Sequence, residues 1–200
     1  MIAVWPHAEL CRPLAYRKNP VSRIAHFAST SNRHMETLKI LDSIRRQYPD
    51  VPAANSAAEA AAIENFKEFF SSFAADRIDK LLSKTYASDI YFNDTLKTLR
   101  GIEDLAHYLK DSANAVQDCR VEVLDVTRTA DNDHYFRWKM MIRFKRFKKD
   151  EDTWTVGMSH LRFNAQGLVV YHQDYWNATD GIFRHIPLLG TMINAVIKRL

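Results

Sequence analysis

Cysteine is scarce in this chain, and long apolar runs are missing from it. Only Cys11 and Cys119 occur in 200 residues, too few for a disulfide framework or a Cys-rich metal site, which fits a reducing cytoplasm. No apolar run reaches the roughly 18 residues that span a bilayer, and residues 1–30 lack the continuous apolar core of a secretory signal. We therefore expect a cytoplasmic protein that needs no metal and no cofactor.

An excess of charge is also missing from the larger part of the chain. Residues 1–50 hold eight basic and four acidic residues, whereas residues 51–200 hold twenty of each, so the formal net charge of +4 comes from the first quarter. Nucleic-acid-binding domains carry their basic excess on the folded binding face, so we expect no nucleic-acid partner. Residues 1–35 are nearly free of acid, which is typical of a disordered arm and resembles, more weakly, a targeting segment. Met35 is an alternative start site.

Hydrophobic periodicity divides the chain into three parts. Residues 1–55 are predicted to form an extension, partly disordered, with one short helix over 35–48. Residues 56–182 form a domain, and residues 183–200 form an amphipathic helix. The elements expected within the domain are a helix capped by Ser56, a helix over 77–85, a strand over 86–95, a helix over 102–115, and strands over 120–129, 134–148, 153–164 and 168–176. Helices followed by an antiparallel meander indicate an α+β fold.

Two stripes of aromatic or apolar residues point to the core. The first helix of the domain carries phenylalanines at helical spacing, which core packing explains, with a cofactor site as the alternative. The strand over 134–148 alternates between a face that should be buried and a basic face that should be solvated or contact a second copy of the chain, with an RNA platform as the alternative. We therefore predict a homodimer through the outer sheet face. The residues concerned are Ile63, Phe66, Phe69, Phe70 and Phe73 on the helix, Phe136, Trp138, Met140, Ile142 and Phe144 on the buried face, and Tyr135, Arg137, Lys139, Met141, Arg143 and Lys145 on the basic face.

A carboxylate lies within the apolar and aromatic strand over 168–176. Alternation places His172 and Asp174 on the same face of this strand. A buried carboxylate pairs with another group or holds a proton, so Asp174 indicates a polar group deep in a pocket. His160 should face away from the pocket if its neighbour Ser159 lines it. Strand histidines are more often satisfied structural residues than functional ones.

The element order resembles that of the nuclear transport factor 2-like (NTF2-like) superfamily over residues 60–180. The run Asp89-Ile90-Tyr91-Phe92-Asn93-Asp94 matches its first strand. Asp174-Tyr175-Trp176-Asn177, followed by Ile186-Pro187-Leu188-Leu189-Gly190, is similar to uncharacterised bacterial members of its SnoaL-like branch. The resemblance implies a curved sheet wrapped around helices, with a conical cavity for a small, largely apolar molecule. Unrelated chemistries occur in this fold, so it does not name the reaction.

Two other branches of the superfamily imply roles for the acids. Similarity to ketosteroid isomerase places Asp94 in the general-base position and Ser159 where the oxyanion-stabilising Asp stands. Similarity to limonene epoxide hydrolase makes Asp174 the water activator, with Tyr91 and Asn93 as the pair that holds the water. SnoaL-type cyclases use an Asp with a nearby His, which implies Asp174 with His160 or His172.

Both matches depart from the family pattern at the second catalytic group. The oxyanion-stabilising Tyr of the isomerase falls near Glu68 or Phe69, and the middle strand has Arg137-Trp138-Lys139 where the hydrolase carries a second acid. A base without an aimed donor or acid loses much of its catalytic power. Arg137 is left to orient Asp174 electrostatically.

These observations support two hypotheses. In the first, the chain is an isomerase, cyclase or hydrolase in which Asp174 and Asp94 perform acid/base chemistry, tuned by Arg137 or His172. In the second, it is a non-catalytic binding or dimeric scaffold module, and both acids are structural. The C-terminal helix is expected to cap the cavity mouth, with a membrane surface or a partner subunit as alternatives. The residues expected to line or underlie the cavity are Tyr91, Phe92, Asn93, Phe136, Arg137, Trp138, Met140, Ser159, His172 and Trp176.

Overall fold

A computed structural model describes residues 36–146, 150–186 and 189–199. The chain divides into two compact units, and the larger one runs from Asp50 onward. The smaller unit contains a helix over residues 36–47, close to the helix predicted over 35–48. The expected disordered arm and the alternative start at Met35 lie outside the described residues.

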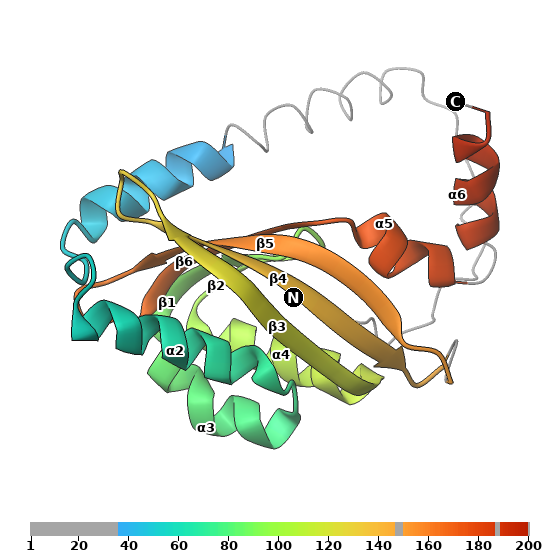
Figure 1. Ribbon diagram of the computed structural model, residues 1–200, viewed down its shortest axis with the longest axis horizontal. Coiled ribbons are helices and arrows are strands. Elements are labelled where there is room, and N and C mark those ends of the chain that lie inside the picture. Colours follow the sequence, from blue (N-terminus) through green and yellow to red (C-terminus); the bar gives the residue numbers. More distant parts are fainter. Residues whose placement is uncertain (1–35, 147–149, 187–188, 200) are drawn as a thin grey trace, which may run out of the picture. The chain divides into compact units, whose positions relative to one another are not determined.

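The larger unit follows the predicted order of helices and strands (Figure 1). Its elements are α2 (Ala57–Ser71), α3 (Ala75–Thr85), β1 (Tyr86–Asn93), β2 (Thr98–Arg100), α4 (Ile102–Ala115), β3 (Val116–Arg128), β4 (His134–Phe144), β5 (Thr153–Phe163), β6 (Val169–Trp176), α5 (Ala178–Gly181), the 3-10 helix η1 (Phe183–His185) and α6 (Leu189–Ile197). The α+β prediction is confirmed. Sequence periodicity missed the short edge strand β2 and the short helix α5.

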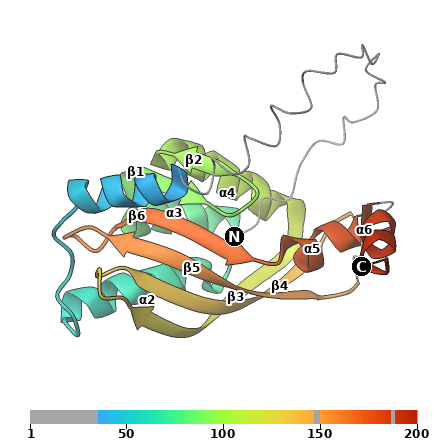
Figure 2. The ribbon, with the colours of Figure 1, turned by 90° about the horizontal axis from the view of Figure 1, so that it is seen from above.

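One six-stranded sheet, in the order β2-β1-β6-β5-β4-β3, forms the body of this unit. All neighbours are antiparallel except the parallel pair β1–β6. The long strands β3, β4 and β5 are curved (Figure 2). Helices α2 and α4 pack on β3, while α3 and α4 pack on β1, so the three helices cover the concave side of the sheet.

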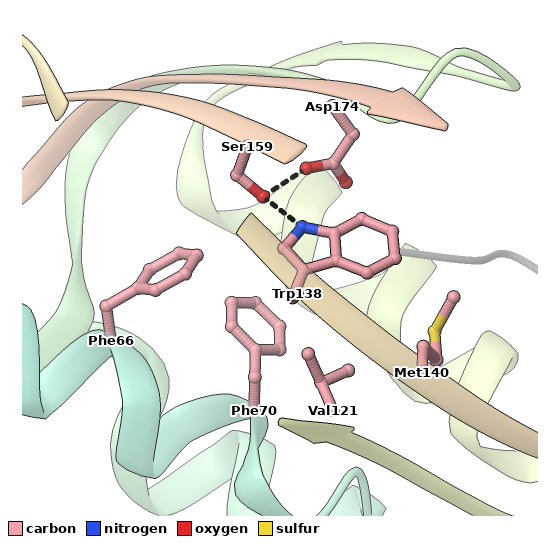
Figure 3. A pocket seen from close by; sticks show the side chains of 7 residues that line it. All are labelled: Phe66, Phe70, Val121, Trp138, Met140, Ser159 and Asp174. Carbon is pink, nitrogen blue, oxygen red and sulfur yellow. Dashed lines mark hydrogen bonds between the residues drawn. The ribbon is translucent and has the colours of Figure 1, made fainter. Parts of the chain in front are cut away.

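The phenylalanine stripe of α2 is core, as predicted. Phe66 and Phe70 point from α2 toward the concave face of the sheet (Figure 3), and both are at most 2% exposed. The Phe66 ring lies 4.7 Å from that of Phe136 on β4. Strand β4 alternates as predicted, with Trp138 buried and Arg137 exposed, except that Met141 on the predicted basic face is also buried. The core is therefore formed in part by apolar contact between α2 and β4.

The C-terminal segment is not one continuous helix, which corrects the prediction over 183–200. Ile186 has an extended backbone with ψ 123°, the conformation that a following proline favours. The 3-10 helix η1 therefore ends before α6 begins. In both views α5 and α6 lie beyond the same end of the sheet (Figures 1 and 2).

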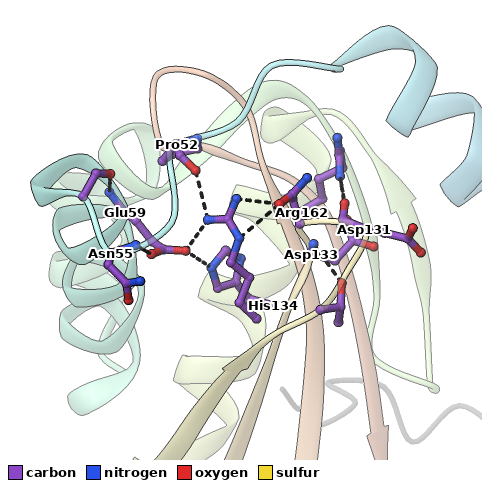
Figure 4. A network of polar contacts seen from close by, with 11 residues as sticks. Pro52, Asn55, Glu59, Asp131, Asp133, His134 and Arg162 are labelled. Atoms are coloured by element: carbon purple, nitrogen blue, oxygen red, sulfur yellow. Dashed lines mark hydrogen bonds and ion pairs between the residues drawn. The ribbon is translucent and has the colours of Figure 1, made fainter.

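A charge cluster ties the first turn of α2 to the β3–β4 hairpin (Figure 4). The predicted cap is present: Ser56 Oγ accepts the Glu59 N–H at 3.1 Å, and Glu59 Oε2 accepts the Asn55 N–H at 2.6 Å. Glu59 Oε1 also accepts from Arg128 Nη1 and from His134 Nε2, the latter at 2.8 Å. Burial opposes ionisation of Glu59, but these donors outweigh it and lower its pKa to about 2.

We expect Glu59→Gln to reveal this cluster through the pH dependence of stability. The folded-state pKa of Glu59 lies below its ordinary value of 4.5. The ionised Glu59 therefore contributes fully to the free energy of unfolding above pH 4.5, and this contribution is lost as the pH falls toward 2. E59Q should reduce the free energy of unfolding by about 1–3 kcal/mol at neutral pH. Urea unfolding followed by circular dichroism, repeated at decreasing pH, measures the difference.

The matched control is Glu64→Gln, which breaks the exposed Glu64–Lys67 pair on the same helix. This change should cost less than about 0.5 kcal/mol at any pH. If the free energy of unfolding of E59Q stays below that of the parent by the same amount from neutral pH to pH 2, the stabilisation by the cluster is not ionic.

Candidate functional site

A small cavity lies between α2 and the concave face of the sheet (Figure 3). Its volume is about 10 Å³, which admits a single water molecule. The wide cone that the resemblance implies is therefore closed to a larger molecule in this conformation. Four predicted residues line the cavity, namely Trp138, Met140, Ser159 and Asp174, together with Phe66, Phe70 and Val121.

Asp174 is completely buried, and the sheet register brings Ser159 of β5 directly opposite it. Ser159 Oγ donates to Asp174 Oδ1 at 2.5 Å. His172 Nε2 lies 2.7 Å from the same oxygen. The indole Nε1 of Trp138 donates to Ser159 Oγ at 2.9 Å. Neighbouring strands thus deliver polar groups to one carboxylate oxygen at the cavity wall.

Behind this carboxylate, His172 is held by Tyr86 at the start of β1. The Tyr86 hydroxyl lies 2.9 Å from His172 Nδ1, and the two rings are nearly parallel at 5°. Phe66 and Phe92 place their rings against the imidazole at 5.5 and 4.9 Å. His172 itself is 0% exposed. The imidazole therefore has a polar partner at each nitrogen and aromatic rings around it.

The chemistry of the donors fixes where the hydrogen bonds to Asp174 point. An indole N–H only donates, so the Ser159 proton is left to point at Asp174. Burial, and next the negative charge of Asp174, raise the pKa of Tyr86 well above its ordinary value, so its hydroxyl stays protonated beside His172 Nδ1. An ionised carboxylate can only accept, so His172 Nε2 carries the proton that it donates to Asp174. Both branches of the network end on Asp174 Oδ1.

The two predicted acids have pKa values shifted in opposite directions. Burial opposes the charge of Asp174, but the His172 imidazole chiefly outweighs it and holds the pKa of that carboxyl below its usual range. Burial raises the pKa of Asp94, and the hydrogen bond from Tyr108 only partly offsets it. Asp174 is therefore the ionised member of the pair, while Asp94 holds a proton to a higher pH than an ordinary carboxyl does.

Asp94 closes the turn after β1 and does not line the cavity. Its Oδ1 accepts the N–H groups of Leu96 and Lys97 at 3.0 and 2.8 Å, and the Tyr108 hydroxyl donates to its Oδ2. Trp176, a predicted cavity residue, donates its indole N–H to the Asp94 carbonyl at 2.8 Å. The carboxyl of Asp94 is thus engaged by its own loop and by α4.

Tyr91, Asn93 and Arg137 are corrections to the predicted site, because all three face away from the cavity. Tyr91 stacks on Tyr171 at 5.4 Å. Asn93 Oδ1 accepts from the side chain of Gln173 at 3.2 Å. Arg137 is paired with Asp125 at the surface, so it does not orient Asp174. Strand alternation is the physical reason, since their neighbours Phe92 and Trp138 face inward.

His160 lies on the opposite face of β5 from Ser159, as predicted. Its Nε2 contacts Asp133 at 2.9 Å, and Arg162 donates to the other oxygen of Asp133 at 2.7 Å. His172 is therefore the histidine that meets Asp174.

Gly157 makes room for the ring that orients Ser159. The register places it opposite both Trp138 and Trp176. A Cβ at this position would come within 2.4 Å of the Trp138 ring and 2.7 Å of Trp176. Because no side chain intervenes, the Trp138 indole lies across β5 and reaches Ser159 two residues further along. Any larger residue would push Trp138 out of this position.

Sequence reasoning missed Tyr86, Tyr108 and Val121. Tyr86 lies 86 positions from its partner His172, so no local pattern links the two. Tyr108 is on the buried side of α4, where helical spacing alone predicts plain core. Val121 is on β3, whose inward alternation was a usable signal.

In residues 36–146, 150–186 and 189–199, no three His, Cys, Asp or Glu side chains come together in a way that would hold a metal ion. Within the same ranges, every helix is too short or too polar to cross a membrane.

Solved structures with the same fold share little sequence with this chain. An epoxide hydrolase from Mycobacterium tuberculosis, described as resembling limonene epoxide hydrolase, has a TM-score of 0.51 and 13% identity over 70% of this chain and 98% of its own. A Catenulispora acidiphila protein with a ketosteroid isomerase-like fold, solved with trimethylamine, has a TM-score of 0.52 and 12% identity over 60% of this chain and 88% of its own. A SnoaL-like protein from Jannaschia sp. CCS1 has a TM-score of 0.52 and 13% identity over 65% of this chain and 97% of its own.

At such low identity these likenesses establish the fold alone, which is NTF2-like with SnoaL-like neighbours, as the sequence resemblance implied. No curated protein matches the chain. The family match is more direct, because it covers residues 62–172, from within α2 to His172 of the polar network. By this match the chain belongs to the family described as an uncharacterized conserved protein (DUF2358).

Proposed function

We propose that this protein binds a small, largely apolar molecule beside Asp174 and acts on it by acid/base chemistry. The observation that carries the proposal is an ionised carboxylate on the wall of an apolar cavity, with His172 and Ser159 both on its Oδ1. Phe66, Phe70 and Met140 supply the apolar side of that cavity.

The free-energy cost of burying a charge supports a functional role for Asp174. Removing a charge from water costs several kcal/mol, and a well-packed apolar replacement is often as stable or more so. Asp174 is nevertheless 0% exposed, next to the equally buried His172. Strongly shifted carboxyls beside a cavity are found more often at functional sites than elsewhere.

Among the reaction classes, activation of a water molecule fits this cavity best. A space of about 10 Å³ beside Asp174 admits one water. In this reaction Asp174 takes a proton from the water, and the water oxygen attacks an electrophilic carbon of the substrate. Asp174 then returns the proton to the oxygen that the carbon releases. Ser159 and His172 keep Oδ1 in place throughout. Because the cavity holds only the water, binding of the substrate requires lining side chains to move.

The isomerase and cyclase reactions use the same base on a carbon acid. A low pKa makes Asp174 a weak base, so this chemistry requires a substrate whose carbon proton is already acidic. The two reaction classes differ in where labelled solvent appears in the product. Oxygen from water enters the hydrolysis product, whereas deuterium from D₂O enters the carbon acid.

Asp174→Asn should abolish either reaction. We expect turnover to fall by about a hundredfold or more, measured by mass spectrometry as ¹⁸O incorporation into small apolar epoxides or as deuterium exchange into enolisable ketones. Asp125→Asn, which removes an exposed acid paired with Arg137, is the matched control and should behave like the parent. The proposal fails if the parent introduces neither label, or if D174N and D125N are equally active.

Carboxyl titration gives an independent check that needs no substrate. In ¹³C NMR of the side-chain carboxyls, Asp174 should protonate at a lower pH than an ordinary aspartate, and Asp94 at a higher pH. His172→Gln should move the Asp174 titration upward, because it removes the imidazole that stabilises the ionised form. Ordinary titration of both acids would contradict the proposed roles.

A second candidate is a non-catalytic dimeric module, favoured by an exposed apolar stripe on the outer face of β5. Trp154 and Val156 are 59% and 67% exposed, and Met158 continues the stripe. Beside it lie ion pairs that balance one another, Lys139–Glu122 and Arg143–Asp152. Because its charges are paired, this surface neither repels an identical surface nor attracts a polyanion. We therefore assign it to contact with a second copy of this chain.

Val156→Glu should convert the predicted dimer to a monomer, because it places a like charge from each copy in the centre of the apolar stripe. Sedimentation velocity measures the change, and circular dichroism checks the fold. Gln117→Glu, an exposed position near the start of β3, adds the same charge away from the stripe and should leave the dimer intact. A parent that is monomeric at high micromolar concentration would rule out this interface.

A further inference from the structure

Helix α6 carries an apolar stripe that is open to solvent. Leu189, Met192, Ile193 and Val196 follow the spacing of one helical face. Met192 and Val196 are 66% and 60% exposed. With Ile197, and with Thr179 of α5, they line an open apolar groove of about 400 Å³. Single exposed apolar residues are ordinary, but a contiguous set of this size marks an interaction surface.

Helix α6 packs on the rest of the protein through Gly190, which lies outside the apolar stripe. Gly190 is the buried residue of α6, and its N–H donates to the Ile186 carbonyl at 3.0 Å. A Cβ at Gly190 would come within 2.1 Å of the Arg184 carbonyl oxygen, so α6 packs backbone to backbone on η1. Most of the stripe is open to solvent, with Met192 and Val196 more than half exposed. The stripe is also absent from the lining of the small cavity beside Asp174, so it does not cap that cavity.

The charge near the stripe along the chain is predominantly basic. Residues 178–200 contain Arg184, His185, Lys198 and Arg199 against a single acid, Asp180. The β5 stripe differs, because its neighbouring charges are paired and balanced. An apolar helical face in a predominantly basic segment repels a second copy of itself and attracts an anionic surface.

We propose that α6 is an interfacial helix that docks the protein on a membrane surface rich in anionic lipid. Nine residues extend for about 13 Å, so the helix lies in the plane of the interface rather than across the bilayer. Its apolar stripe enters the boundary between headgroups and acyl chains, while Lys198 and Arg199 contact the lipid phosphates. This interaction does not depend on Asp174.

Co-sedimentation of the full chain with vesicles tests the proposal. Vesicles of three parts phosphatidylcholine to one part phosphatidylglycerol should bind the protein at least about tenfold more strongly than pure phosphatidylcholine, and added salt should weaken the binding. The double change Met192→Gln and Val196→Gln should reduce binding by about tenfold or more. Thr191→Gln with Asn194→Gln, on the other side of the same helix, is the matched control and should bind like the parent.

The remaining outcomes separate the alternatives. Lys198→Gln with Arg199→Gln should remove the preference for phosphatidylglycerol, since each basic residue contributes about fivefold. The proposal is overturned if the parent does not bind the anionic vesicles, or if the stripe variant binds as the parent does. Lipid-free self-association that the stripe variant abolishes would assign α6 to a second copy instead. D174N should retain full vesicle binding, so the result is independent of the proposed function.

Discussion

The buried contact between His172 and Asp174 constrains the strands around it. Tyr86 reaches this pair from the start of β1, Ser159 from β5 and Trp138 from β4. These groups meet only if the register across β1, β6, β5 and β4 is maintained. A one-residue slip would turn every side chain of a strand to the other face and would leave an uncompensated charge among aromatic rings, an outcome that costs several kcal/mol. The network therefore selects one register of the sheet while it fixes the carboxylate at the cavity wall.

The same contact explains why two acids of one domain have different chemistry. Asp174 lies beside an imidazole and a serine hydroxyl, so its ionised form is favoured despite complete burial. Asp94 is just as buried, but the loop N–H groups and Tyr108 only partly offset the effect of burial. Environment, rather than residue type, favours the ionised form of one carboxyl and the protonated form of the other. Only the acid with the imidazole neighbour also lines the cavity.

Periodicity alone predicted α2, α3, α4, the long strands and the capped start of α2, because burial of one face imposes a repeat that is visible in the sequence. It also predicted that Asp174 and His172 share a face and that His160 does not. The errors at Tyr91, Asn93 and Arg137 came from carrying over family roles without applying the same alternation, since Phe92 and Trp138 were expected to face inward as well. Tyr86 was beyond local reasoning, because its partner lies 86 positions away and joins it only through the parallel β1–β6 pair.

Two exposed apolar surfaces of this domain differ in charge, and that difference argues for separate partners. The β5 stripe lies among ion pairs that cancel, so contact with an identical surface costs no electrostatic work. The stripe of α6 lies in a predominantly basic segment, so an identical surface would be repelled and an anionic one attracted. Because α5 and α6 lie beyond one end of the sheet (Figure 1), a dimer formed through the outer face of β5 would leave each α6 stripe open. Each copy would then bring a membrane-binding helix, and two linked contacts hold a surface far more firmly than one.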